Sequence, residues 1–83
     1  MARVVLRDQL RRLCGIDAAE ISVEASDIRR LIRALEERFP GAAAMLNRDG
    51  VAVAIDGVIY NQPLAEKLGT DSEVCFIPAL RGG

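Results

Sequence analysis

Residues 26–41 read Ser-Asp-Ile-Arg-Arg-Leu-Ile-Arg-Ala-Leu-Glu-Glu-Arg-Phe-Pro-Gly, and they hold the one long helical pattern of this 83-residue chain. Ser26 and Asp27 supply an N-cap, and Pro40-Gly41 ends the pattern. Between them the apolar residues recur at the spacing of an amphipathic helix: Ile28, Leu31, Ile32, Leu35 and Phe39. The sequence therefore predicts a single long helix whose apolar stripe must pack against something else.

The opposite face of this helix is charged. It carries Arg29, Arg30, Arg33, Glu36, Glu37 and Arg38. Arg33 and Glu37 are spaced to pair, whereas Arg29 and Arg33 repel each other. The basic half could contact an acidic partner or a phosphate, although a solvated outer face is the favoured interpretation of such a charge run.

Two short strands are predicted before the helix. Residues 3–7 are mainly β-branched and aliphatic, with Val4 and Leu6 on one face, and residues 19–24 alternate with Ile21 and Val23 inward. Between them, Leu10 and Leu13 are three apart, which indicates a short helical turn over residues 9–14 that ends at Gly15. The second strand is expected to run antiparallel to the first.

Three strands are predicted after the helix. Residues 42–50 are expected to be a connection, and the continuous apolar run of residues 51–55 indicates a strand covered on much of both faces. Asp56-Gly57 predicts a tight hairpin to residues 58–60. A short helical or irregular link and a turn then lead to a last strand over residues 73–77, which Pro78 ends because proline has no N–H to donate.

This order of elements predicts an α+β domain of the β-grasp type. It has a mixed sheet of about five strands with one main helix packed on one face. The first and last strands must lie side by side, parallel and interior, to bury Val4, Leu6, Val74 and Phe76 under the helix. We expect residues 1–83 to form a single domain, with residues 78–83 as a flexible C-terminal tail.

Composition excludes several kinds of function. The chain has no histidine, which removes His-based acid–base and nucleophilic catalysis and the commonest metal ligand, so we expect neither an enzyme nor a metal or cofactor site. Eleven basic and twelve acidic residues give no positive field for nucleic acid. Cys14 and Cys75 lack metal or disulfide spacing, and no signal peptide or membrane span is visible, which indicates a cytoplasmic protein with reduced thiols.

The chain ends in Leu80-Arg81-Gly82-Gly83. Glycine has no Cβ, so a Gly-Gly end is thin enough to enter a channel too narrow for side chains, and its carboxylate can be reached by another protein. A frayed end is the alternative explanation for any terminal pair of glycines.

Four segments, in the correct order, resemble the ubiquitin-like sulfur carriers of the MoaD/ThiS family. Residues 10–15 are similar to its Leu-Arg-Glu-Leu-Ala-Gly and residues 32–41 to its helix ending Leu-Glu-Glu-Arg-Tyr-Pro-Gly. Residues 53–57 are similar to its Val-Ala-Val-Asn-Gly hairpin, and residues 63–83 to its Pro-Leu, Gly-Asp-Glu-Val and Pro-Pro-Val-x-Gly-Gly pattern. The proline after the last strand favours the MoaD side. Ala79 and Ser72 depart from the pattern, and Leu80-Arg81 is closer to the ending of ubiquitin.

The resemblance implies a protein cosubstrate rather than an enzyme. An E1-like activating enzyme would use ATP to adenylate the Gly83 carboxylate, which a sulfur nucleophile would convert to a thiocarboxylate. A sulfur-accepting synthase would then receive the sulfur, as in molybdopterin synthase. Thiamin, cysteine, thiolated tRNA and secondary-metabolite pathways stay open as other recipients. The carrier itself is expected to bind no cofactor, nucleic acid or membrane and to be monomeric when free.

Strand alternation places Cys75 and Ile77 on the face of the sheet away from the helix. Ile77, Pro78 and Leu80, together with Ile59 from the hairpin, are therefore predicted to form an apolar partner surface that leads into the tail. Cys75 is interpreted as a small neutral apolar residue of that face.

Two other functions remain open. Leu80-Arg81-Gly82-Gly83 also suits a ubiquitin-like modifier joined through Gly83 to target lysines. A β-grasp binding module without tail chemistry, which would use Arg29, Arg30 and Arg33, is the other alternative.

Overall fold

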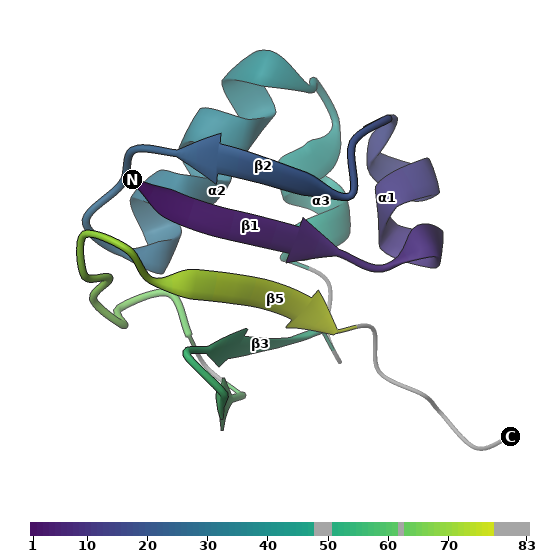
Figure 1. Cartoon of the computed structure of the whole chain (residues 1–83). Helices are drawn as coiled ribbons and strands as arrows, with labels where there is room; N and C mark the ends of the chain where they lie inside the picture. Colours follow the sequence, from purple (N-terminus) through teal and green to yellow (C-terminus); the bar gives the residue numbers. More distant parts are fainter. Residues whose placement is uncertain (48–50, 62, 78–83) are drawn as a thin grey trace, which may run out of the picture.

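Five strands form one mixed sheet in the order β2-β1-β5-β3-β4 (Figure 1). The computed structural model describes residues 1–47, 51–61 and 63–77. The strands are β1 (Ala2–Leu6), β2 (Glu20–Val23), β3 (Ala52–Ile55), β4 (Val58–Tyr60) and β5 (Glu73–Ile77). β1 runs parallel to β5, and the other neighbouring pairs are antiparallel. The predicted α+β arrangement, with the first and last strands interior and parallel, is confirmed.

Three helices lie on one side of the sheet: α1 (Asp8–Cys14), α2 (Ile28–Arg38) and α3 (Ala42–Leu46). The inward residues of α2, Ile28, Leu31, Ile32 and Leu35, are buried, as their spacing predicts. They cover the sheet residues Val4, Val53, Val74 and Phe76, each at most 1% exposed. The helices thus cover the central strands on one face of the sheet, and none of the described helices lies on the other face.

The N-terminus of α2 is closed by polar groups from two segments. The Asp27 side chain accepts the backbone N–H of Arg30 at 2.8 Å, and this hydrogen bond is the main cause that lowers the pKa of the Asp27 carboxyl. The N–H groups of Ile28 and Arg29 donate to the carbonyls of Glu66 and Leu64, both at 3.1 Å. The loop after β4 is therefore fastened to the start of the helix.

The connection predicted over residues 42–50 contains a short helix that the sequence analysis missed, because α3 occupies Ala42–Leu46. Its N-cap is Gly41, at φ 99°, which has no side chain to accept a hydrogen bond. The Glu36 carboxylate of α2 takes this role: it accepts the N–H of Gly41 at 3.0 Å and that of Ala43 at 2.9 Å. These bonds lower the pKa of Glu36.

Smaller predictions also need correction. Leu10 is buried, but Leu13 is 50% exposed, and Cys14 and Ile16 pack in the core instead. β3 is fully covered on one face only, since Val53 and Ile55 are buried, while Ala52 and Ala54 on the other face are half-buried. Among the described residues Arg33 makes no ion pair with Glu37; Arg30 pairs with Asp27.

The hairpin between β3 and β4 follows the sequence closely. Asp56 and Gly57 form a two-residue turn with positive φ values of 50° and 88°, as a tight primed turn requires.

Within the described ranges, no helix is long and apolar enough to span a membrane.

Candidate functional site

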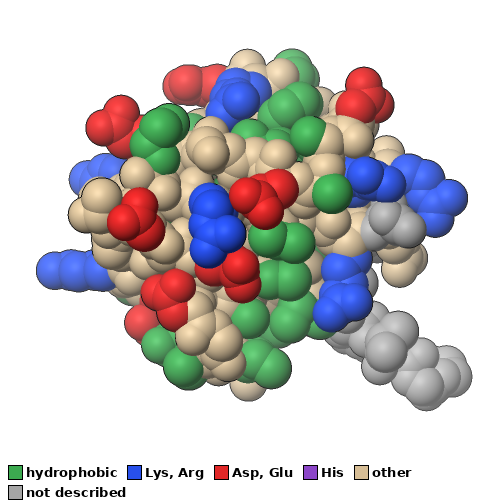
Figure 2. Space-filling model, in the orientation of Figure 1, with side chains coloured by type: hydrophobic (Ala, Val, Ile, Leu, Met, Phe, Trp, Pro, Cys, Tyr) green, Lys and Arg blue, Asp and Glu red, His purple; other side chains and the backbone are tan. Residues whose placement is uncertain are grey.

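A row of apolar side chains crosses the face of the sheet that carries no helix. The register pairs Val5 with Cys75, Cys75 with Ala54, and Ala54 with Ile59. Residues paired in this way point to the same face, so the row runs through four strands, from β1 to β4. Figure 2 shows the exposed apolar side chains on this side of the molecule.

The row is most exposed where it reaches the sheet edge. Val5, Cys75 and Ala54 are half-buried, whereas Ile59 is 63% exposed. A second pair, Ala52 and Ile77, continues the apolar surface toward the end of β5. We call these six residues the open apolar face.

The open apolar face includes two of the residues predicted to contact a partner. Ile59 and Ile77 lie on the same face, but β3 separates their strands, about 10 Å apart at two strand spacings. Ala54 and Cys75 connect them across this distance. Pro78 and Leu80, the other two residues predicted for this surface, are outside the described residues, as are Arg81, Gly82 and Gly83.

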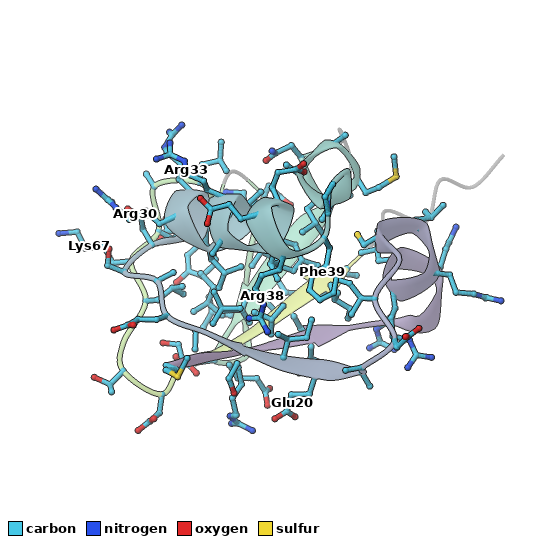
Figure 3. All side chains as sticks on the ribbon, turned by 90° about the horizontal axis from the view of Figure 1, so that it is seen from above. Glu20, Arg30, Arg33, Arg38, Phe39 and Lys67 are labelled. Carbon is cyan, nitrogen blue, oxygen red and sulfur yellow. The ribbon has the colours of Figure 1, made fainter. Side chains whose placement is uncertain are left out.

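Charged residues border the β1 region of the open apolar face at both ends of the strand. Arg3 and Glu73 form an ion pair at 3.6 Å with about half of each side chain exposed. Glu20 of β2 is the register partner of Val5, so it lies next to the row on the side of β2. Its side chain points away from the helices in Figure 3. At the opposite end of β1, exposed Arg7 follows Leu6, which is the register partner of Phe76. Arg7 therefore lies at the level where β5 reaches Ile77.

The two thiols lie in different surroundings. Cys14 is buried in α1, and burial raises the pKa of its thiol. The thiol of Cys75 is half-buried within the open apolar face, 4.0 Å from the carbonyl oxygen of Phe76. In the described part of the chain, no group of three Cys, Asp or Glu side chains is arranged to hold a metal ion.

Val5, Ala52 and Ala54 belong to this face although the sequence did not single them out. The alternation that placed Val4 and Leu6 inward already places Val5 outward. What the sequence lacks is the register, which brings Val5 beside Cys75 from the other end of the chain.

The basic residues of α2 lie elsewhere. Arg30 and Arg33 extend from the N-terminal half of α2, and Lys67 from the adjoining loop projects from the same end of the molecule (Figure 3). All three are exposed, and the Arg30 guanidinium pairs with Asp27. This end is separate from the open apolar face.

Comparison with known proteins identifies the family. The model of the ThiS family matches residues 4–83. Comparison with curated proteins finds no match. Among solved structures, a chain of the Amycolatopsis orientalis BexX/CysO complex is 18% identical, with a TM-score of 0.85 over 100% of both chains. CysO of Mycobacterium tuberculosis is also 18% identical, with a TM-score of 0.84 over 96% of this chain and 100% of its own.

SAMP1 of Haloferax volcanii is similar as well, at 18% identity and a TM-score of 0.74 over 99% of this chain and 98% of its own. At such low identity these likenesses establish the β-grasp fold, as predicted. The family match establishes the lineage and confirms the resemblance drawn from the four sequence segments. The chain belongs to the ThiS family and is a ubiquitin-like sulfur carrier, a protein cosubstrate and not an enzyme.

Proposed function

We propose that the Gly83 carboxyl is the sulfur-bearing group and that the open apolar face is the surface by which partner enzymes hold the carrier. The observation that carries the proposal is the continuity of this face with Ile77, the last residue of β5, after which only six residues remain before the carboxylate. A partner that binds this face is therefore separated from the reacting group by only these six residues.

The chemistry needs two displacements. A carboxylate oxygen of Gly83 attacks the α-phosphorus of ATP on an E1-like activating enzyme, and pyrophosphate leaves with the electron pair of the broken P–O bond. Sulfide then attacks the carbonyl carbon, the C–S bond forms, the C–O bond to AMP breaks, and AMP leaves with the electron pair. The product is a C-terminal thiocarboxylate, whose sulfur passes to a synthase. ATP belongs to the activating enzyme, and the carrier holds no cofactor.

The folded body supplies the binding energy that orients the tail. Interactions remote from the reacting centre can fix its position and thereby lower the barrier. Because both partners would use the same face and the same carboxyl, the activating enzyme and the synthase are expected to bind in turn. The BexX/CysO complex, in which a similar fold meets a partner, supports such an interface. We place the free carrier in the cytoplasm as a monomer, with residues 1–83 as one domain and 78–83 as its flexible tail.

Protein modification through Gly83 is a second candidate function. It uses the same adenylate but ends in an amide with a lysine, and Leu80-Arg81-Gly82-Gly83 together with the likeness to SAMP1 favours it. Adducts in cell extract with a Gly-Gly remnant on lysine would support modification. If the thiocarboxylate forms and no such adducts are found, sulfur transfer is the only one of these two functions that remains. The binding-module alternative predicts that replacing Arg29, Arg30 and Arg33 together abolishes function, whereas sulfur transfer should survive the change.

Deletion of Gly83 tests the proposal. The truncated chain ends about 3.5 Å short, beyond the contact that in-line attack requires. We expect unchanged melting temperature and affinity for the activating enzyme, with loss of ATP–pyrophosphate exchange and of the mass increase from exchanging oxygen for sulfur. Gly82→Ala should fold equally well and react more slowly, because its Cβ obstructs a narrow channel. Wild-type exchange by the truncated chain would show that Gly83 is not the reacting group.

A further inference from the structure

Lys67 is the only lysine of the chain; the other ten basic residues are arginines. The distinction is chemical, since the guanidinium of arginine stays protonated and does not act as a nucleophile, whereas the amine of lysine does when neutral. A protein whose own carboxyl becomes an acyl adenylate therefore offers one side-chain amine to that adenylate.

The backbone around Lys67 is held firmly while its side chain is free. Lys67 forms an isolated antiparallel bridge with Asp27. On either side, the carbonyl of Glu66 accepts the N–H of Ile28 at 3.1 Å, and Leu68 donates to the carbonyl of Ser26 at 2.9 Å. The Lys67 side chain is exposed and extends outward in Figure 3. No described carboxylate forms an ion pair with it.

The other candidate nucleophiles are less available. The N-terminal amine donates to the carbonyl of Thr70 at 2.6 Å. Cys14 is buried, and Cys75 is half-buried within the open apolar face. Lys67 is therefore the accessible amine of the described surface that has no hydrogen-bond partner.

The position of Lys67 favours attack on the tail of another copy. Its loop lies at the end of the sheet where β5 begins, and β5 ends at Ile77 on the opposite side (Figure 1). The six residues after Ile77 span at most about 21 Å. Running back along the five residues of β5 would use about 16 Å of that length. Little of the tail's length would then remain to reach the Lys67 amine of the same copy while an enzyme holds the tail.

We propose that Lys67 is the acceptor through which the activated Gly83 carboxyl of one copy is joined to a second copy, so that any chains contain a single type of isopeptide bond. This inference rests on the proposed function, because it uses the same adenylate. The neutral Lys67 amine attacks the Gly83 carbonyl carbon and the C–N bond forms. The C–O bond to AMP breaks, AMP leaves with the electron pair, and the amine loses a proton to solvent.

The test uses the full-length chain, ATP and the adenylating enzyme that activates it, without a sulfur donor. Wild type and Lys67→Arg, which keeps the charge, are compared by intact mass and by tryptic mapping. Trypsin cleaves after Arg81, so an isopeptide bond leaves Gly-Gly on the acceptor. We expect wild type to give a dimer lighter than two chains by one water, with the remnant on Lys67. Lys67→Arg should give none, yet exchange pyrophosphate at the wild-type rate.

Three results would overturn the inference while leaving sulfur transfer intact. These are a dimer from Lys67→Arg in equal yield, a remnant on another group, and pyrophosphate exchange by wild type with no conjugate. A monomer that is lighter by one water would show an intramolecular bond, and this result would also overturn the inference. Failure of wild type to exchange pyrophosphate would refute both this inference and the proposed function. Thermal melting of both proteins confirms that the variant is folded.

Discussion

Replacing Ile59 with alanine should weaken the complex with the activating enzyme and leave the fold intact. Ile59 is 63% exposed on the open apolar face, so most of its side chain is available for burial by a partner. The change removes three carbons, which contribute roughly 0.8 kcal/mol each when buried. Scaled by the exposed fraction, the loss is about 1.5 kcal/mol, which corresponds to about a tenfold higher Kd.

Val58 provides a matched control for this prediction. It is the neighbour of Ile59 in β4 and is 54% exposed, but its register partner is the buried Ile55, so it points to the helix side of the sheet. Val58→Ala removes a similar β-branched side chain from the same edge strand. Both variants should lose less than about 1 kcal/mol of stability, and only Ile59→Ala should weaken binding.

Isothermal titration calorimetry with the activating enzyme measures the two Kd values, and urea unfolding measures the two stabilities. Equal weakening by both variants would assign the effect to the edge strand and not to the open apolar face. Wild-type affinity of Ile59→Ala would refute the proposed docking surface.

Three further predictions concern the fold. Leu35→Ala should lower the free energy of unfolding by about 2 to 5 kcal/mol because Leu35 is fully buried, whereas Leu13→Ala, at a half-exposed site, should cost much less in the same urea titration. Gly57→Ala should destabilise the hairpin by about 1 kcal/mol since φ is 88° there, and Gly57→Asn should cost less; similar melting temperatures for both would contradict the turn geometry. The Glu36 carboxyl has a lowered pKa in the folded state, so its stabilising effect is present above the ordinary glutamate value of about 4.3 and is lost as the pH falls through the lowered pKa. Glu36→Gln should thus be less stable than wild type at pH 7, with the difference shrinking at acidic pH; a constant difference would exclude the carboxylate as the cap of α3.

Much of the fold could be read from the sequence because its signals are local. The spacing of Ile28, Leu31 and Leu35 places one face of α2 inward regardless of what it meets, and Asp56-Gly57 selects a tight turn by backbone preference alone. The Gly-Gly terminus is likewise evident without any structure. These features depend on residues within a few positions of each other.

The features that sequence reasoning missed depend on contacts between distant residues. α3 has no side-chain cap of its own, and the carboxylate that replaces it comes from Glu36 on the preceding helix. Whether Val51–Ile55 was covered on one face or both could not be decided until the helices were placed on a single side.

By itself, the sequence determined the five strands, the main helix, their order and the family, and it predicted the Gly-Gly end as the reacting group. The tertiary structure alone decided which residues share a surface. Parallel pairing of β1 with β5 and antiparallel pairing of β5 with β3 align Val5, Cys75, Ala54 and Ile59 in one row. Hydrogen bonds between the start of α2 and the loop around Lys67 hold the only lysine at the end of the sheet opposite Ile77. Both placements follow from register and loop closure, which are set by long-range backbone hydrogen bonds that local sequence patterns do not specify.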